Sequence, residues 1–243
     1  MSDHPATPRA TAPPGASPAI PRGVTSTRPS TVSAGSSGAC ARLPKNVIFD
    51  VGNVLLSWDP AAILREHVAP GVDHGFYRRA ICDHVDWIEL DRGTLEEEEA
   101  ILRFAERTGA PLDLLHRLVH ASKTSLTPMP DSLALLEELH RGGIGLYCLS
   151  NMSHGTWEFL RPRHEFWSRF KGILISAELG LVKPDAAIYR HLLDTWSLAP
   201  AETVFLDDRP DNVKGARAVG IHSFVFEGAA KARARLHEGR WSD

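Results

Sequence analysis

Short apolar runs alternate with helical patterns along most of the chain. Five runs have the length and content of buried strands, at residues 47–49, 144–149, 172–176, 203–206 and 221–226. Between the later runs, apolar residues recur every three to four positions, as they do on the buried side of a helix. Strands that alternate with helices are typical of a parallel sheet covered by helices. We therefore predict an α/β fold with a doubly wound parallel sheet.

The stretch between the first two strands has helical patterning only. Asp59-Pro60 is a helix start signal, because proline suits the first helical position and aspartate the position before it. We predict an all-helical domain over residues 60–125, inserted into a core formed by residues 43–59 and 126–228. Within it, residues 85–93 combine a tryptophan with carboxylates and an arginine. That segment suits either recognition of a sugar or an ordinary loop between helices.

The two ends of the chain lie outside the predicted core and the predicted helical domain. Residues 1–42 are rich in Pro, Ser, Thr, Ala and Gly, and such a segment is expected to be a disordered tail. A plain tail or a mis-assigned start accounts for it better than a targeting signal does. Residues 229–243 form a separate C-terminal segment.

Composition narrows the classes of function. The net charge of −3 lacks the basic excess of a nucleic-acid binder, so we expect no nucleic acid as partner. Three widely spaced cysteines indicate neither a metal site nor a disulfide framework, which favours a cytoplasmic location. No apolar stretch is long enough to span a bilayer, and no membrane partner is expected.

Polar residues stand where the predicted strands end. They are Asp50, Ser150 with Asn151, Lys183 beyond the third strand, and Asp207 with Asp208. The carboxyl ends of parallel strands lie at one edge of a sheet, where ligands of such folds bind. Carboxylates gathered there repel one another unless a cation lies between them, and hard oxygen ligands favour Mg²⁺. With a hydroxyl and a lysine beside them, they indicate phosphoryl transfer. By contrast, His116 and His120 stand one helical turn apart without a nearby carboxylate partner, and we expect an ordinary surface pair.

Four motifs give the chain a resemblance to the haloacid dehalogenase-like hydrolase superfamily, in the branch with a helical cap after the first strand. The motifs occur in order over residues 44–228 and are 49–55 (FDVGNVL), 149–151 (LSN), 180–185 (GLVKPD) and 204–208 (VFLDD). Within the superfamily, the chain resembles bacterial alpha-D-glucose-1-phosphate phosphatases and neighbouring hydrolases. This resemblance implies a Rossmann-like core with a helical cap, and a Mg²⁺-dependent phosphatase acting on a small phosphorylated metabolite such as a sugar phosphate.

The resemblance also implies roles for individual residues. Asp50 would be the nucleophile that forms an aspartyl-phosphate, with Ser150, Asn151 and Lys183 binding the phosphoryl group. Asp50, Asp208 and the backbone carbonyl of Gly52 would hold the metal, and Asp207 would be a further or water-mediated ligand.

The chain departs from the superfamily at one position. Most of its phosphatases carry a second aspartate two residues after the nucleophile, as general acid and base, where this chain has Gly52. A good leaving group, a metal-bound water, or a carboxylate from the flap or cap could make up for the loss. Asp59 is the candidate nearest in sequence, although a helix N-cap is the more ordinary role for it.

Other functions stay open at this point. A metal-independent 2-haloacid dehalogenase also uses an aspartate nucleophile, but its carboxylate substrate would be repelled by Asp207 and Asp208. A catalytically weak phosphometabolite-binding protein is compatible with Gly52. A phospho-accepting receiver is disfavoured, because its acidic pair precedes the accepting aspartate. A monomer and a homodimer are both compatible with the sequence.

Overall fold

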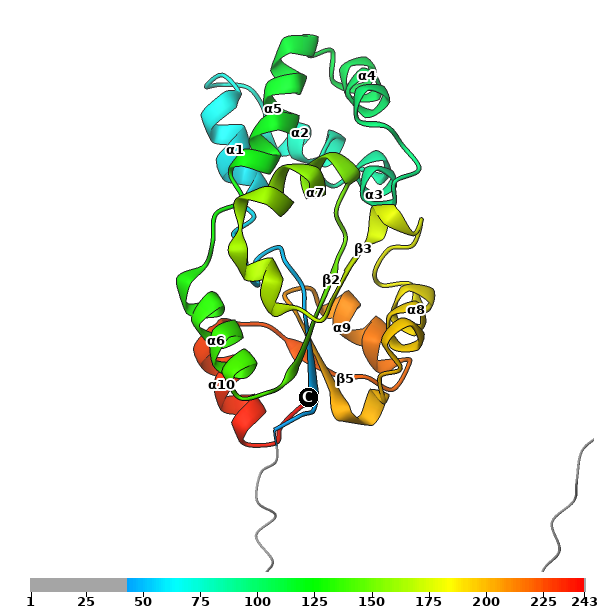
Figure 1. Cartoon of the computed structure of the whole chain (residues 1–243). Coiled ribbons are helices and arrows are strands. Elements are labelled where there is room, and N and C mark those ends of the chain that lie inside the picture. Colours follow the sequence, from blue (N-terminus) through cyan, green and yellow to red (C-terminus); the bar gives the residue numbers. More distant parts are fainter. Residues whose placement is uncertain (1–42, 243) are drawn as a thin grey trace, which may run out of the picture. The chain divides into compact units, whose positions relative to one another are not determined.

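A five-stranded parallel sheet forms the centre of the computed structural model, which describes residues 43–242 (Figure 1). Its strands, in spatial order, are β3 (Gly172–Ile175), β2 (Gly145–Ser150), β1 (Asn46–Phe49), β4 (Thr203–Asp207) and β5 (His222–Val225). Each predicted run forms a strand, and all the pairings are parallel. The predicted α/β class is confirmed. The tail predicted at residues 1–42 lies outside the described residues.

Helices cover both faces of the sheet. Side chains alternate between the two faces along a strand, so Val47 and Phe49 pack into one core cluster and Ile48 into another. The first cluster also contains residues of α6 (Pro130–Arg141) and α10 (Ala229–His237). The second contains residues of α8 (Ala186–Trp196) and α9 (Pro210–Arg217). Strands buried on both faces need continuous apolar runs, which is the pattern that the sequence has.

Residues 60–125, called the helical insert from here on, contain five helices. These are α1 (Pro60–His67), α2 (His74–Ala80), α3 (Val85–Arg92), α4 (Glu97–Thr108) and α5 (Leu112–Thr124). They pack around a core cluster of their own. Helix α1 starts as predicted, because Asp59 accepts a hydrogen bond from the Ala62 backbone N–H at 2.9 Å. Residues 85–92 are helical, so the reading of this segment as a loop is wrong.

The helical insert contacts the segments that follow β2 and β3. After β2 the chain forms α7 (His154–Leu160). Two short 3₁₀ helices follow α7 in the chain, η1 (Arg161–Arg163) and η2 (Glu165–Arg169). After β3 comes η3 (Ser176–Glu178), and η4 (Pro200–Glu202) precedes β4. Helix α3 packs on η3, and α5 packs on α7. The helical insert therefore lies over the carboxyl ends of the strands, as Figure 1 shows.

Gly93 permits the closest of these contacts. It ends α3 in the left-handed conformation, with φ of 77°, and a Cβ atom there would lie 2.5 Å from the carbonyl oxygen of Ala177 in η3. No side chain larger than hydrogen fits between the two backbones, so this glycine lets the last turn of α3 sit directly on η3.

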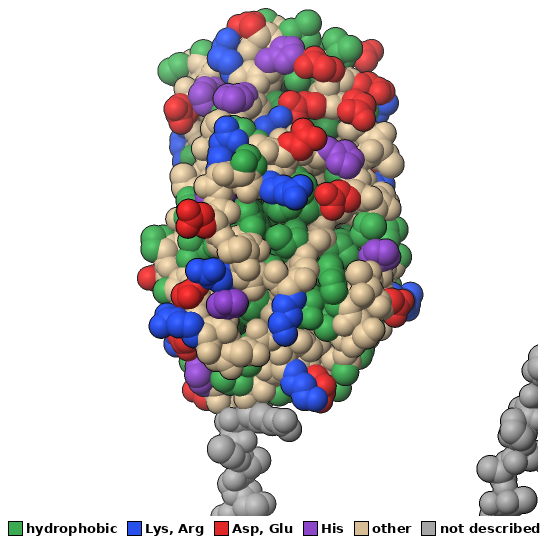
Figure 2. All heavy atoms as spheres, viewed as in Figure 1, with side chains coloured by type: hydrophobic (Ala, Val, Ile, Leu, Met, Phe, Trp, Pro, Cys, Tyr) green, Lys and Arg blue, Asp and Glu red, His purple; other side chains and the backbone are tan. Residues whose placement is uncertain are grey.

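Surface features carry less information about function. Acidic and basic side chains are interspersed on the face drawn in Figure 2. Within the described range, no helix has the length and apolar content needed to cross a membrane.

Candidate active site

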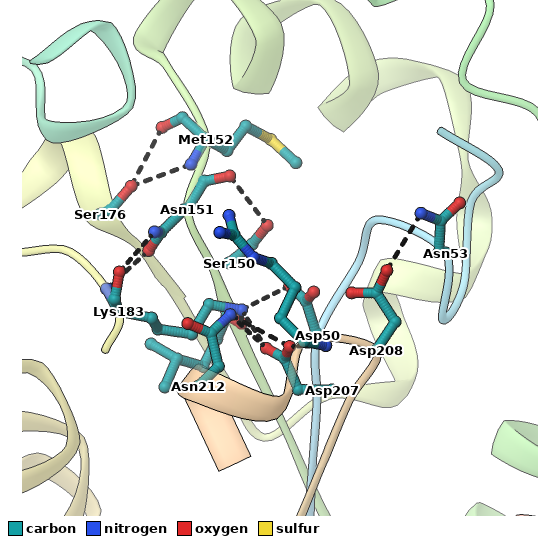
Figure 3. A network of polar contacts seen from close by, with 12 residues as sticks. Asp50, Asn53, Ser150, Asn151, Met152, Ser176, Lys183, Asp207, Asp208 and Asn212 are labelled. Atoms are coloured by element: carbon teal, nitrogen blue, oxygen red, sulfur yellow. Dashed lines mark hydrogen bonds and ion pairs between the residues drawn. The ribbon is translucent and has the colours of Figure 1, made fainter. Parts of the chain in front are cut away.

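The register of the sheet places the predicted site residues at one edge. Phe49 lies opposite Leu206 of β4 and Cys148 of β2, so the residues that follow these strands emerge together. The backbone N–H of Asp50 donates to the Leu206 carbonyl at 2.9 Å, which continues the ladder by one residue. Asp50 therefore leaves the sheet beside Asp207, as the close-up in Figure 3 shows.

Lys183 joins the two carboxylates. Its ammonium lies 2.6 Å from Asp50 Oδ1 and 2.7 Å from Asp207 Oδ2, and it donates to the Leu149 carbonyl at 3.0 Å. All three donors of the ammonium thus have partners. Asp50, Lys183 and Asp207 are each less than 10% exposed, so these ion pairs are buried.

Asp207 is held on every side. Besides Lys183, its carboxylate accepts from the Asn212 side chain at 3.0 Å and from the Arg209 backbone N–H at 2.8 Å. A carboxylate with this many donors is fixed in place and has little capacity left for a further direct ligand. The fixed carboxylate of Asp207 is therefore suited to holding the Lys183 ammonium in position.

Asp208 does not pair with Lys183 and is oriented by Asn53 instead. The Asn53 amide donates to Asp208 Oδ2 at 3.1 Å, while its oxygen accepts from the Trp58 backbone N–H at 2.9 Å. Asn53 has a positive φ of 53°, a conformation that asparagine tolerates better than most residues. The loop after β1 is therefore shaped around Asp208.

Three carboxylates converge closely enough to share a cation. Oxygen atoms of Asp50, Asp207 and Asp208 lie within 4.8 Å of one another, and this is the one such group among residues 43–242. Lys183 is the ammonium that pairs with two of these carboxylates, Asp50 and Asp207, so the group of three keeps an excess of negative charge and attracts a cation. Hard oxygen donors in this number suit Mg²⁺, which leaves several positions for water or phosphate oxygens.

Burial and ion pairing act against each other at the centre of the site. Burial raises the pKa of Asp50 above its ordinary value, Lys183 opposes the rise, and the charge of Asp207 adds to it. For Lys183, burial alone would lower the pKa, but the charges of Asp207 and Asp50 outweigh it and raise the pKa. The lysine therefore stays charged at neutral pH.

Ser150 and Asn151 lie beside these charges at the end of β2. The Asn151 amide donates to the Lys183 carbonyl at 2.9 Å, and its oxygen accepts from the Lys183 backbone N–H at 2.8 Å. Both polar atoms of this side chain thus hold the lysine's backbone. Ser150 Oγ lies 3.5 Å from the Asn151 carbonyl.

A cavity of about 110 Å³ opens next to this edge, between the sheet and the helical insert. Gly52, Ser150 and Asn151 line it from the sheet side, and α3 contributes Trp87 and Asp91. Its remaining lining residues are Val51, Trp58, Ser122, Leu126, Met152 and Thr156. Pockets that enclose drug-sized ligands are larger, at about 300–1,000 Å³, so a bulky leaving group requires the insert to move.

Two candidates proposed from the sequence lie away from this cavity. The Asp59 side chain is 60% exposed, serves as the N-cap of α1, and lies 3.6 Å from Arg65. It is therefore wrongly placed for a replacement acid. His116 and His120 form no metal group within the described residues, and His116 pairs with Glu98 at 3.7 Å.

The model of the haloacid dehalogenase-like hydrolases matches residues 44–220, which is most of the chain. The chain belongs to this hydrolase family. Its relatives include a sesquiterpene phosphatase of Aspergillus oryzae, 31% identical over 73% of this chain and 87% of that protein. A drimenol cyclase of Aspergillus calidoustus is 30% identical over 78% of this chain, which spans only 35% of that longer protein.

Solved structures of the family share this fold. A haloacid dehalogenase family enzyme of Bacteroides thetaiotaomicron, solved in complex with magnesium and inorganic phosphate, aligns with a TM-score of 0.60 at 22% identity. The alignment covers 75% of this chain and 93% of that one. At this identity the likeness concerns the fold.

Four polar residues shape the site through contacts that the sequence does not reveal. Asn53 and Asn212 stand inside or just after the recognised motifs, but their roles as donors to Asp208 and Asp207 depend on loop conformation. Ser176 was read only as the end of a strand, and Asp91 only as one of several charges in residues 85–93. The latter two meet in space, since Ser176 Oγ donates to the Asp91 backbone carbonyl.

Proposed function

We propose that this hydrolase is a Mg²⁺-dependent phosphatase that acts on a small phosphorylated metabolite through an aspartyl-phosphate at Asp50. One observation carries the proposal. The Asp50 carboxylate lies at the sheet edge, 2.6 Å from Lys183 and within 4.8 Å of the oxygens of Asp207 and Asp208. A nucleophile, a fixed positive charge and a cation-binding carboxylate group are the parts that phosphoryl transfer needs.

The residues would divide the work as follows. One oxygen of Asp50 attacks phosphorus while the bond to the leaving oxygen breaks, and water then attacks phosphorus to release phosphate and restore Asp50. Lys183 favours the ionised form of Asp50 before the attack and pairs with the phosphoryl oxygens after it. Ser150 and the backbone N–H of Asn151 would bind the same oxygens.

The metal ligands are proposed on the same basis. Asp50, Asp208 and the Gly52 carbonyl would hold Mg²⁺, and Asp207, whose donors already surround it, would act through water. The ion would supply electrostatic stabilisation of the phosphoryl oxygens. The relative that was solved with magnesium and phosphate supports this choice of ion.

Two classes of leaving group are candidates. The likeness to alpha-D-glucose-1-phosphate phosphatases favours a sugar phosphate, for which Asp91, Ser122 and Thr156 offer polar groups in the cavity. The phosphate ester of an apolar alcohol is the second candidate. It is supported by the sesquiterpene phosphatase among the relatives, and by Trp58 and Trp87, whose ring centroids lie 5.9 Å apart beside the cavity. In either case we propose that the helical insert acts as a cap, which excludes water and selects the substrate.

A substrate panel tests the proposal. Wild type and Asp50→Asn are assayed on p-nitrophenyl phosphate, sugar phosphates and prenyl phosphates, with Mg²⁺ or with EDTA. We expect Mg²⁺-dependent phosphate release by the wild type, and background rates for the variant. Equal rates for wild type and variant would refute the nucleophile. Halide release from 2-chloropropionate without metal would instead identify the dehalogenase alternative, and phosphometabolite binding without turnover would identify a binding protein.

A further inference from the structure

The sheet side of the site lacks the carboxyl group that would act as general acid after the nucleophile. A carboxylate two residues after Asp50 would serve, but Gly52 occupies that position and cannot ionise. An alkoxide leaving group departs slowly without a proton, and general acid catalysis typically contributes about 10²–10⁴-fold. A group elsewhere in the cavity has to supply the proton if the substrate is an ordinary alkyl phosphate.

Asp91 is the one ionisable side chain among the described residues that line the cavity. It belongs to the last turn of α3, so it reaches the cavity from the side of the helical insert, opposite Gly52 and Ser150. The alternative candidate, Asp59, is exposed and caps α1.

The position of Asp91 is fixed by contacts with the sheet side. The backbone N–H of Ser153, in the loop that follows Ser150 and Asn151, faces its carboxylate and lowers the pKa of that group. The fully buried Ser176 also holds the backbone of Asp91, because its Oγ donates to the Asp91 carbonyl. The same Oγ accepts from the Met152 N–H at 2.9 Å, a contact drawn in Figure 3. Gly93, two residues on, allows the tight contact of α3 with η3.

We propose that Asp91 is the general acid and base of this enzyme, supplied by the helical insert in place of the aspartate missing at Gly52. The inference rests on the phosphatase function proposed above. As Asp50 bonds to phosphorus and the ester bond breaks, the Asp91 proton passes to the leaving oxygen, which departs as an alcohol. Asp91, now ionised, takes a proton from the water that attacks the aspartyl-phosphate, and phosphate and both aspartates are restored.

The charges around Asp91 suit this role. Burial raises the pKa of Asp91 to about 7, and the negative charge of Asp50 adds to the rise. The positive charges of Lys183 and Arg209 and the backbone N–H of Ser153 lower the pKa but do not outweigh burial. On its own helix, the neighbouring Arg92 is paired with Glu89 and Asp185. A carboxyl group that is partly protonated at neutral pH can both give and take a proton.

Leaving-group dependence tests the proposal. Asp91→Asn, the matched control Asp59→Asn and the wild type are assayed on p-nitrophenyl phosphate, which needs no proton, and on an alkyl phosphate, which does. We expect Asp91→Asn to lose roughly 10²-fold or more in kcat/KM on the alkyl phosphate, but less than about tenfold on the aryl phosphate. The decline of the wild-type kcat/KM above about pH 7 should disappear in this variant. Asp59→Asn should match the wild type on both substrates.

A rescue experiment separates catalysis from structure. A Cβ atom at Gly52 would meet nothing closer than Trp58 Cβ at 3.9 Å, so a side chain can be introduced there without a clash at its first atom. Gly52→Asp in the Asp91→Asn background should restore much of the lost alkyl phosphatase activity, which a merely structural Asp91 would not allow.

The outcomes are distinct. If Asp91→Asn loses equal kcat/KM on the two substrates, the inference is overturned while the phosphatase function stands. The same holds if the wild-type rate falls steeply as the pKa of the leaving group rises. If the wild type and Asp50→Asn are alike on p-nitrophenyl phosphate, the proposed function itself fails. The wild-type slope needs no variant, so the inference stays testable even if Asp91→Asn does not fold.

Discussion

At the scale of single residues, the buried ion pairs of Lys183 with Asp50 and Asp207 hold the centre of the site together at the carboxyl edge of the sheet. Each strand-end residue follows an apolar run, and the geometry of parallel sheets brings such residues together. The convergence of Asp50, Asp207 and Asp208 could therefore be predicted. The Asn53 and Asn212 contacts could not, since they depend on a positive φ and on the first turn of α9.

The position of Asp91 in the site could not be predicted from the sequence. Its helix lies far along the chain from the strands, and its carboxylate enters the site only because α3 packs on η3. No spacing in the sequence encodes that contact. The glycine after Arg92 is a visible helix-end signal, but it does not tell which surface the helix end touches.

The raised pKa of Asp91 predicts a pH-dependent stability. A carboxyl whose pKa rises from 3.8 to about 7 on folding destabilises the folded state increasingly as the pH rises between these values. An asparagine side chain cannot ionise, so Asp91→Asn without Mg²⁺ should gain stability over the wild type between pH 4 and pH 7 and keep the gain above. The full rise corresponds to about 4 kcal/mol, and we expect roughly half or less, because the side chain is only partly buried. Thermal melts at pH 4, 6 and 8 measure the difference, and a difference independent of pH would contradict the account.

At the scale of elements, helix α9 sits directly against the segment that carries Lys183. A Cβ atom on Gly215 of α9 would lie 2.5 Å from the Pro184 carbonyl oxygen. The Lys183–Pro184 segment and α9 are therefore in backbone contact, and the motif spacing in the sequence does not reveal it.

Gly215→Ala should force these two segments apart. We expect a loss of about 1–3 kcal/mol in stability, together with reduced activity as Lys183 moves. Gly142→Ala is the matched control, because Gly142 ends α6 with an ordinary φ of −71° and its Cβ would lie 3.4 Å from its nearest neighbours. Urea denaturation of both variants measures the difference. Equal stability of the two variants would refute the close contact.

Helix α3 is tied to α4 through a buried charge. The Asp86 side chain, 7% exposed, lies 3.2 Å from Arg103 and pairs with Arg107, and both arginines belong to α4. Burial pushes the pKa of Asp86 up, but hydrogen bonds from Arg107 and Arg103 outweigh it and leave the pKa below its ordinary value. The sequence predicts an all-helical region over residues 60–125 but does not delimit the short α2 and α3, because tertiary contacts of this kind stabilise them.

Asp86→Ala should therefore loosen the helical insert. Removing one partner of a fully buried pair costs about 3–5 kcal/mol. Because Arg103 is 46% exposed, we expect about 2–3 kcal/mol here. Asp113→Ala removes the exposed pair with Arg117 in α5 and should leave the stability almost unchanged, because solvent screens exposed ion pairs. Thermal melts compare the variants, and similar losses would show that Asp86 is not a buried anchor.

At the scale of the whole molecule, the sheet and its strand order place the three carboxylates of the site under the helical insert. The class of fold follows from the alternation of apolar runs and helical periods. The packing of the insert on α7 and η3 does not, because it depends on surfaces formed by residues far apart in the sequence. The participation of α10 in the core was likewise not foreseen, although Ala229, Ala232 and Leu236 show helical spacing.

Binding of Mg²⁺ should stabilise the molecule as a whole. A ligand at 100 times its Kd adds about 2.7 kcal/mol, which in a domain of this size raises the Tm by roughly 5–10 °C. We expect the increase with Mg²⁺ in the wild type and its loss in Asp208→Asn. Asp211→Asn, an exposed acidic neighbour in α9 that pairs with Lys214, should keep it. Persistence of the increase in Asp208→Asn would place the metal elsewhere.

The central claim is that Asp50 takes the phosphoryl group onto its own carboxylate. The most direct test is to quench the enzyme in acid during turnover of p-nitrophenyl phosphate with Mg²⁺, and to map the adduct by mass spectrometry. The account predicts a phosphoryl group on the peptide that contains Asp50, absent in Asp50→Asn. Turnover without any such adduct, or an adduct on another residue, would contradict it.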